Sequence, residues 1–148
     1  MKKETGKLLN QLFFEYITSY HQKVGIVFNH DDDTMPKCNK NQRKALFVIK
    51  RQKRIIQIDL GKSLDLSKGA LTILLDSLEK FDLVKRENDL KDRRKTWVQL
   101  TEKGEQYIDS KLRLYELGIV EIFKEIDEKE IIKATENLKE LIKLMDKL

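Results

Sequence analysis

Apolar residues recur every three or four positions along most of this chain, which is the spacing of helices that bury one face. The first such stretch predicts a helix over residues 7–28. A polar connector follows at residues 29–37, where Pro36 argues against helix. Asn39, with Gln42 three positions later, has the spacing of a capping box and predicts the start of a second helix.

The middle of the chain has the pattern of helix, turn and helix. A short strand at Ile55 and a helix over residues 57–64 precede a turn that ends at Ser67. Serine is a favoured N-cap, so a further helix is expected to start there. The buried stripe of that helix follows the i, i+3, i+4, i+7 spacing and consists of Leu71, Leu74, Leu75 and Leu78.

A two-stranded hairpin is predicted directly after this helix. Asp82 lies where the helix has to end, and aspartate tolerates the left-handed conformation better than most residues. Residues 83–86 and 96–100 have the composition of short strands, and a polar loop at residues 87–95 connects them. Helix, turn, helix and hairpin in this order indicate a winged helix-turn-helix.

Two long helices are predicted after the hairpin, one opening at residues 101–104 and the other capped by Asp127. Their apolar positions repeat with a period near 3.5, which is typical of helices that pack against partner helices. We therefore expect a dimer interface, although packing of the two helices within one chain would give the same pattern. The residues expected at this interface are Leu12, Tyr16, Ile119, Ile122, Leu138, Leu141 and Met145.

The predicted fold class is mainly α with a small β-wing. A winged helix-turn-helix lobe occupies residues 39–100. It is flanked by an N-terminal dimerisation helix and connector at residues 1–38 and by C-terminal dimerisation helices at residues 101–148, all in one intertwined fold.

Positive charge is concentrated on the predicted lobe. The whole chain has a net charge of +5, but residues 39–100 hold 16 Lys or Arg against 8 Asp or Glu, a net +8. Residues 1–38 are neutral, and residues 101–148 carry a net −3. This asymmetry implies a polyanionic partner, most commonly nucleic acid. The alternative is that Lys-rich faces only keep the protein soluble, and the order of the motifs favours nucleic acid.

The outward face of the helix that starts at Ser67 is where contacts to base edges are expected. Ser67 and Lys68 can reach phosphates or guanine acceptors, and Thr72 can hydrogen-bond or touch a thymine methyl group. Gly69 permits close approach to the DNA backbone, and Ile73 can pack on a thymine methyl, although a single exposed isoleucine is common. Because this face has no Asn, Gln or Arg, specificity is expected to depend on DNA shape as well.

Four cations lie near the tip of the hairpin loop, namely Lys91, Arg93, Arg94 and Lys95. One arginine is expected to enter a minor groove, while the other cations neutralise phosphates. Asp92 is unfavourable beside DNA unless it pairs within the protein, so we expect it to orient Arg94. A solvated run of charge is the alternative interpretation.

A set of motif residues carries a family resemblance. It consists of Asp92-Arg93-Arg94, Val98, Leu100-Thr101 and Gly104, supported upstream by Leu60, Leu64, Ser67, Thr72, Leu78-Glu79-Lys80 and Leu83. On these residues, and in element order over its whole length, the chain resembles the MarR family of bacterial transcriptional regulators. The resemblance implies a triangular homodimer whose first, fifth and sixth helices interlock and whose lobes each read half of a near-palindromic operator. It also implies that Arg94 is the minor-groove residue and that small molecules, metals or oxidants modulate binding.

The sequence departs from the family pattern at three positions. Asp65 and Asp82 stand where glycine is usual, and Ile56 stands where a capping Thr or Ser is usual. These differences concern local geometry more than function.

Sensing sites are less well supported by the sequence. His21, His30, Asp31–Asp33 and Cys38 lie near one another, but adjacent acids on a loop are usually solvated, so we expect no metal and no cofactor. Cys38 would need a stabilised thiolate to sense peroxide. The resemblance places it where an aliphatic residue is usual, which favours a small buried hydrophobe and leaves a redox role as the alternative.

An organic effector of unknown identity can lie between the first, second and fifth helices, near Tyr16, Tyr20 and Phe47, although aromatic residues there are more often core. The chain has no Ser/His/Asp spacing, phosphate loop or Gly-rich nucleotide turn, so an enzyme is not expected. One cysteine, no signal-peptide block and no apolar run of ~20 residues point to a cytoplasmic protein that does not enter membranes.

Together these patterns predict a sequence-specific regulator that binds double-stranded DNA, acting as a homodimeric, effector-responsive repressor on a near-palindromic operator. The alternative is a winged-helix module that uses its basic lobe or its helical seams to bind another protein and has no operator.

Overall fold

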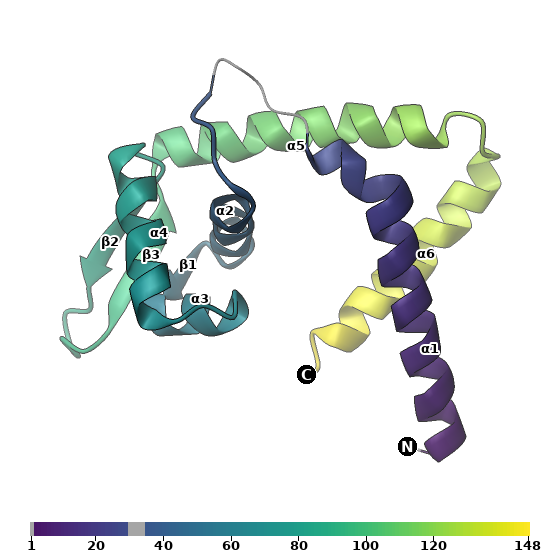
Figure 1. Ribbon diagram of the computed structural model, residues 1–148, viewed down its shortest axis with the longest axis horizontal. Coiled ribbons are helices and arrows are strands. Elements are labelled where there is room, and N and C mark those ends of the chain that lie inside the picture. Colours follow the sequence, from purple (N-terminus) through teal and green to yellow (C-terminus); the bar gives the residue numbers. More distant parts are fainter. Residues whose placement is uncertain (1, 30–34) are drawn as a thin grey trace. The chain divides into compact units, whose positions relative to one another are not determined.

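The computed structural model describes residues 2–29 and 35–148. Its helices and strands follow the predicted order (Figure 1). The helices are α1 (Lys3–Ser19), α2 (Lys40–Gln52), α3 (Gln57–Ser63), α4 (Lys68–Lys80), α5 (Glu102–Phe123) and α6 (Glu128–Met145), and the strands are β1 (Arg54–Ile56), β2 (Val84–Asn88) and β3 (Thr96–Leu100). No helix in this described part is long and apolar enough to span a membrane.

The chain forms two compact units. One, the winged unit, comprises Asn29–Leu114, and the other, the helical unit, comprises Met1–Phe28 and Tyr115–Leu148. The winged unit contains the helix-turn-helix, the three strands and the first part of α5. The predicted class, mainly α with a small β-wing, is therefore confirmed. The division of the chain at residues 38 and 100 stays a prediction.

The predicted leucine stripe of α4 forms one wall of the core of the winged unit. Leu71, Leu74, Leu75 and Leu78 are all buried. They belong to one continuous cluster with Leu46 and Ile49 of α2 and with residues of β3 and α5. Burying each leucine removes apolar surface from water, a contribution of about 1.5–3 kcal/mol per side chain. The amphipathic pattern of α4 therefore leaves its opposite face free for other contacts.

Caps place the starts of α2 and α4 as predicted. Asn39 Oδ1 accepts the Gln42 N–H at 3.0 Å while Gln42 Oε1 accepts the Asn39 N–H at 2.7 Å, a complete capping box. Ser67 Oγ accepts the N–H of Ala70 at 3.3 Å at the start of α4. Gln42 also donates to Ser77 Oγ at 2.9 Å, so the first turn of α2 lies beside the C-terminal half of α4.

The three strands form an antiparallel sheet in the order β1-β3-β2. Val98 of β3 pairs with Ile55 of β1 on one side and with Arg86 of β2 on the other. Ile55 and Val98 are buried in the core. Because side chains alternate along a strand, Trp97 is on the opposite, outer face. The loop between β2 and β3 projects from the winged unit (Figure 1) and is called the wing below (residues 89–95).

Two of the residues that depart from the family pattern, Asp65 and Asp82, have a positive φ, which explains why glycine is usual at these positions. Asp65 ends the turn after α3 with a φ of 53°, and Asp82 follows α4 with a φ of 58°. Aspartate is one of the few non-glycine residues that visit this left-handed region readily. Lys53 also has a positive φ, 63°, but its ψ of −44° lies outside the left-handed region, and no feature of the sequence predicted it. Ile56, the third departure, precedes α3 without a side-chain cap.

A close backbone approach fixes the start of α5 against the end of α4. The Thr101 hydroxyl donates to the Asp82 carbonyl at 2.5 Å, and its oxygen accepts the Gly104 N–H at 3.0 Å. A Cβ on Gly104 would lie only 2.0 Å from the carbonyl oxygen of Leu83. Thr101 and Gly104 of the motif therefore pack the start of α5 against the segment that follows α4.

The helical unit differs from the prediction at the end of its first helix. Instead of continuing to residue 28, α1 ends at Ser19 and is followed by a π-helical turn (Tyr20–Val24) and a 3₁₀ turn (Gly25–Asn29). The prediction of one helix over residues 7–28 was therefore right as far as Ser19 and wrong in helix type beyond it. Apolar spacing cannot distinguish these tighter or wider turns from a short α-helical continuation, since each covers only five residues and is too short to show its own period.

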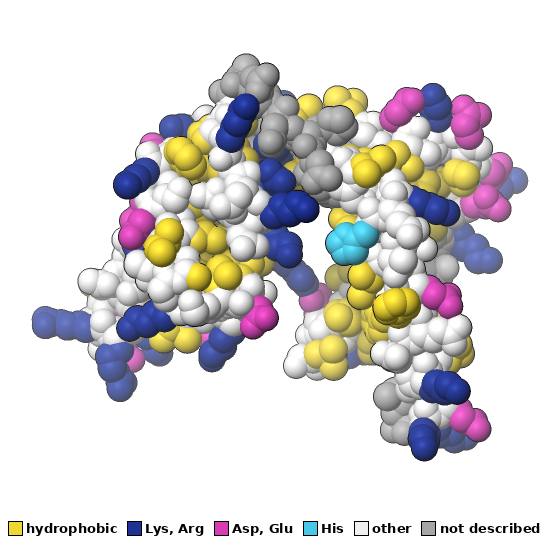
Figure 2. Space-filling model, in the orientation of Figure 1, with side chains coloured by type: hydrophobic (Ala, Val, Ile, Leu, Met, Phe, Trp, Pro, Cys, Tyr) yellow, Lys and Arg dark blue, Asp and Glu magenta, His cyan; other side chains and the backbone are white. Residues whose placement is uncertain are grey.

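Apolar side chains cover the surfaces of α1 and α6 in the helical unit (Figure 2). Of the residues expected at a dimer interface, Leu12, Tyr16, Leu138 and Met145 are exposed, and Ile119, Ile122 and Leu141 are half-buried. Asp127 caps α6 by accepting the Lys129 N–H at 2.9 Å.

Candidate nucleic-acid interface

The first half of α4 presents the predicted recognition residues on the surface of the winged unit. Ser67, Lys68, Gly69 and Ile73 are exposed, and 73% of the Ile73 surface is accessible. A Cβ added to Gly69 would meet nothing within 4 Å, so this position is open for close approach by a ligand. Thr72 is half-buried, and its hydroxyl donates to the Lys68 carbonyl at 2.9 Å. The hydroxyl oxygen of Thr72 can still accept a hydrogen bond from a partner, and its methyl group can still make an apolar contact.

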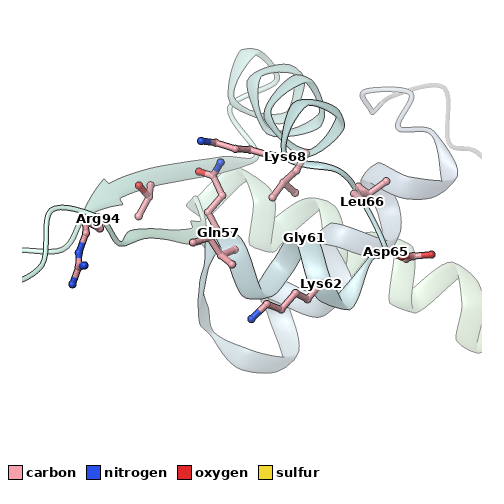
Figure 3. Close-up of a pocket in the computed structure, with 10 residues that line it drawn as sticks. Gln57, Gly61, Lys62, Asp65, Leu66, Lys68 and Arg94 are labelled. Atoms are coloured by element: carbon pink, nitrogen blue, oxygen red, sulfur yellow. The ribbon is translucent and has the colours of Figure 1, made fainter.

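A groove of about 660 Å³ runs along this surface beside the start of α4. Its lining comes from α3, from the turn before α4, from α4 itself and from the end of the wing with the start of β3. In the close-up, Lys68 and Gln57 extend into the space between α4 and the strands, with Arg94 at the wing end (Figure 3). Lys62 and Asp65 line the groove as well.

The groove adds two residues that sequence reasoning missed. Gln57 and Lys62 are polar residues of α3 that line the same groove as Lys68 and Arg94. Lys62 is one of 16 Lys or Arg residues between positions 39 and 100, and nothing in the local sequence distinguishes it from the others. Gln57 was overlooked because the search for base-reading amides was confined to α4.

The wing carries the predicted cations at one end of the winged unit. Lys91, Arg93, Arg94 and Lys95 are exposed, and Lys and Arg side chains gather at that end of the molecule (Figure 2). Arg94 donates from Nε to Asp92 Oδ1 at 3.1 Å and from its backbone N–H to the same oxygen at 3.1 Å. These bonds from Arg94 lower the pKa of the Asp92 carboxyl below its usual value. Asp92 is thus paired within the wing, while the Arg94 side chain remains 91% exposed.

The two acids on the outer side of α4 are paired with a strand residue. Arg86 of β2 donates from Nη2 to Asp76 Oδ1 at 2.5 Å and to Glu79 Oε2 at 2.5 Å. The hydrogen bond to Glu79, followed by that to Asp76, raises the pKa of Arg86. Pairing compensates the negative charge in the second half of α4, so the first half and the wing provide the cationic part of this surface.

A further acid, Asp89, organises the wing and was also missed. Its Oδ1 accepts the backbone N–H groups of Lys91 at 2.8 Å and Asp92 at 2.9 Å. Its Oδ2 accepts the indole N–H of Trp97 at 2.8 Å. Two signals were available: aspartate readily forms such a turn with the backbone two residues on, and a partly buried tryptophan needs an acceptor for its N–H.

These hydrogen bonds predict a pH-dependent contribution to stability. The bond from Trp97, followed by those from the backbone of Asp92 and Lys91, lowers the pKa of Asp89 from 3.8 to about 2. The folded protein then binds fewer protons at this carboxyl than the unfolded chain. Its stabilising effect is complete well above pH 3.8 and is lost as the pH falls toward 2.

The measurement compares wild type with Asp89→Asn by urea unfolding, followed by the fluorescence of Trp97, the single tryptophan of the chain. We expect the difference in unfolding free energy between the two proteins to shrink between about pH 6 and about pH 3, as the carboxyl of the unfolded chain takes up its proton. A difference that stays constant over this range would contradict the role of the ionised carboxylate.

The other predicted sensing residues contribute less to this picture. Cys38 is buried in the core of the winged unit with an exposed fraction of 3%, and its redox role stays untested. His30 and Asp31–Asp33 lie outside the described residues. Among the residues that are described, no group of three His, Cys, Asp or Glu side chains could hold a metal ion. Tyr16 and Tyr20 pack against each other in the helical unit with ring centroids 6.2 Å apart.

Comparison with known proteins identifies relatives of this chain. The sequence pattern of the MarR family matches residues 38–96. The chain is 36% identical over 64 residues to YkoM, an uncharacterized HTH-type transcriptional regulator of Bacillus subtilis (strain 168), covering 43% of this chain and 42% of YkoM. It is 30% identical over 114 residues to YwhA, a regulator of the same description and organism, covering 74% of this chain and 77% of YwhA. The match thus spans less than half of YkoM and about three quarters of YwhA.

Solved structures share the fold over nearly the whole chain. A MarR family protein from Bacillus stearothermophilus has a TM-score of 0.71 and 20% identity, with 99% of each chain covered. A mutant MarR from E. coli complexed with operator DNA has a TM-score of 0.54 and 22% identity, with 94% of each chain covered. At these identities the structures show the fold alone. The family pattern on the lobe and the identity to YwhA across most of both chains establish the relationship, and the chain belongs to the MarR family.

Proposed function

We propose that this MarR-family chain is a transcriptional regulator that binds a specific double-stranded DNA site, and that it is not an enzyme. The observation that carries the proposal is the groove that Lys68 of α4 and Arg94 of the wing line together. One recognition residue and one wing cation thereby border the same surface, as a helix in a major groove and a loop in the neighbouring minor groove require. The operator complex of the E. coli relative supports this interpretation.

In this proposal Ser67, Lys68, Gly69, Thr72 and Ile73 face the major groove. Lys91, Arg93 and Lys95 contact phosphates, and Arg94, oriented by Asp92, enters a minor groove. Gln57 and Lys62 extend the contact along the groove on α3. Phosphate contacts position the lobe, and the few contacts from α4 to base edges, together with DNA shape, select the sequence.

The proposed regulator acts as a homodimer. The exposed apolar residues of α1 and α6 support this, since a contiguous apolar surface on a water-exposed helix is usually covered by a partner. Two lobes related by twofold symmetry would read a near-palindromic operator with half-sites about one helical turn apart. Repression, and its relief by a small-molecule effector, follow from the same proposal, because an effector that prefers one spacing of the lobes shifts the population toward it.

Selection of bound sequences from random duplex DNA tests this function most directly. We expect enrichment of a motif with two symmetric half-sites, and a mass in solution of twice the chain. Enrichment of a single unrepeated half-site, or a stable monomer, would overturn the dimeric model. No enrichment at ~0.15 M salt, where specific protein–DNA complexes normally persist, would overturn DNA binding and favour a protein-interaction module.

Replacing Arg94 with alanine is expected to weaken operator binding by about 1–3 kcal/mol. The substitution removes the exposed guanidinium that Asp92 orients, and it leaves the buried core of the unit intact. Fluorescence anisotropy titrations at several salt concentrations measure the effect. Arg113→Ala, which removes an exposed arginine of α5, is the matched control and should leave affinity nearly unchanged. Equal affinities and equal salt dependence for the two variants would refute the role of Arg94.

A further inference from the structure

A chain of three side chains in contact connects the wing to the opposite edge of the sheet. Asp89 lies directly after β2 and holds the turn of the wing through the N–H groups of Lys91 and Asp92. Its other oxygen accepts the indole N–H of Trp97 in β3 at 2.8 Å. The guanidinium carbon of Arg54 in β1 lies 3.8 Å from the centre of the Trp97 ring. Asp89, Trp97 and Arg54 are not among the residues proposed to touch DNA.

The path crosses the whole sheet because β3 is its central strand. Trp97 is paired in register with Ile56 of β1 and Glu87 of β2. The strand β1 ends at Ile56, and α3 begins at the next residue, Gln57, which lines the groove. Asp89, Trp97 and Arg54 therefore connect the turn of the wing to the entrance of the helix-turn-helix. In Figure 3 the two ends of this path are marked by Arg94 on the wing and Gln57 on α3.

We propose that Asp89 is a positioning residue for DNA binding, acting through Trp97 and Arg54 to hold the wing at a set distance from α3 and α4. This inference rests on the proposed function and adds to it the device that fixes the spacing between wing and recognition helix. Asp89 itself touches no DNA in this mechanism.

The device works by arranging the wing before the duplex arrives. A free loop of this length would lose conformational entropy on binding, and that loss would subtract from affinity. Three hydrogen bonds to one carboxylate, which are strengthened by its charge, impose the order in the unbound protein. The stacked Arg54 adds a cation–π contact that holds the indole in place.

The charge of Asp89 makes the proposal testable against simple electrostatics. A carboxylate on a loop beside phosphates repels DNA, so removing its charge should strengthen binding if charge were its whole effect. If Asp89 is a positioning residue, removing the charge weakens binding instead. Asp89→Asn separates the electrostatic effect from the positioning effect. Its amide oxygen can still accept the backbone N–H groups, but its NH₂ group then faces the indole N–H, and two donors cannot form a hydrogen bond.

The experiment measures affinity for the selected operator duplex, and for one of scrambled sequence, using full-length dimeric protein. We expect Asp89→Asn to weaken operator binding roughly 10- to 150-fold, the range for loss of a charge-assisted hydrogen bond. Asp82→Asn is the matched control, since it removes the same charge from an exposed residue that does not line the groove and keeps a side chain that tolerates the left-handed conformation. It should bind as tightly as wild type or more tightly.

Trp97→Phe gives a second, independent variant. It removes the indole N–H while keeping an aromatic ring beneath Arg54, and it should weaken binding by a similar factor. The emission of Trp97 in the free protein supplies a readout that is separate from DNA. Asp89→Asn should shift that emission to longer wavelength and increase its quenching by acrylamide, whereas Asp82→Asn should leave both unchanged. A thermal midpoint well above the temperature of the titrations, measured for each variant, excludes general unfolding.

Each remaining outcome decides a different point. Operator affinity of Asp89→Asn equal to or above that of Asp82→Asn would overturn the positioning role. Wild-type affinity for Trp97→Phe, or unchanged emission in Asp89→Asn, would overturn the connection through Trp97. If wild-type protein binds no duplex at all, the proposed function fails first, and this inference fails with it.

Discussion

Gly104→Ala should destabilise this protein by about 3 kcal/mol, near the upper end of what overpacking a tight site costs. The new Cβ would stand 2.0 Å from the Leu83 carbonyl oxygen and 2.9 Å from its carbon, both of them backbone atoms. Backbone atoms cannot avoid the new Cβ by a change of rotamer, as a side chain can. The start of α5 therefore has to move relative to the segment after α4. That movement would also strain the bonds that Thr101 makes with Asp82 and with the N–H of residue 104.

Gly69→Ala is the matched control because it is the same substitution in the first turns of a helix. Nothing lies within 4 Å of a Cβ at that position, so only helix propensity acts, and stability should rise by up to ~1 kcal/mol. Urea unfolding at equal protein concentrations measures both variants, since the stability of the proposed dimer would depend on concentration. Equal shifts in the two variants would show that the approach of α5 to Leu83 is looser than described.

The triple variant Lys91→Glu, Arg93→Glu and Lys95→Glu should lose operator binding by a factor on the order of 10²–10³. These side chains are exposed on the wing, and each reversed charge both removes an attraction to phosphate and adds a repulsion. The slope of log affinity against log salt should become less steep by about 0.9 for each phosphate that the protein no longer neutralises. Anisotropy titrations between ~0.05 and ~0.3 M salt give both quantities.

A second triple variant controls for the change in net charge. Lys40→Glu, Lys44→Glu and Lys103→Glu reverse three lysines at the starts of α2 and α5. The start of α2 lies beside Ser77, in the half of α4 that is remote from Ser67. This variant should keep most of its affinity. If both triple variants lose binding equally, the effect comes from net charge, and the wing has no special role.

Local signals in the sequence were sufficient to predict most of the fold. Asn39 with Gln42, and Ser67, mark helix starts because the capping bonds involve residues only three positions apart. The leucine stripe of α4 identifies its buried face because helical periodicity is itself local. The same reasoning failed after Ser19, where a π-helical turn replaces α-helix without a change in apolar spacing.

In the candidate site, too, the residues marked by local signals were predicted, and those brought together by tertiary packing were not. Periodicity assigned Lys68 and Ile73 to the outward face of α4. Charge density on the loop predicted an arginine in a minor groove, and the family resemblance selected Arg94, so these residues were found from sequence alone. What they do on DNA remains a prediction. The groove in which Lys68 and Arg94 are joined by Gln57 and Lys62 could not be found in this way, since it brings together α3, α4 and the wing.

By itself the sequence determined the order of the elements, the faces they bury and the concentration of cations on the lobe, because each of these depends on residues within a few positions of one another. Only the tertiary structure decided that Asp89 binds Trp97, that Arg54 stacks on the same ring, and that Gly104 lies against Leu83. Those contacts join residues that are distant in the chain, and antiparallel pairing of the strands and packing of α5 are what bring them within bonding distance.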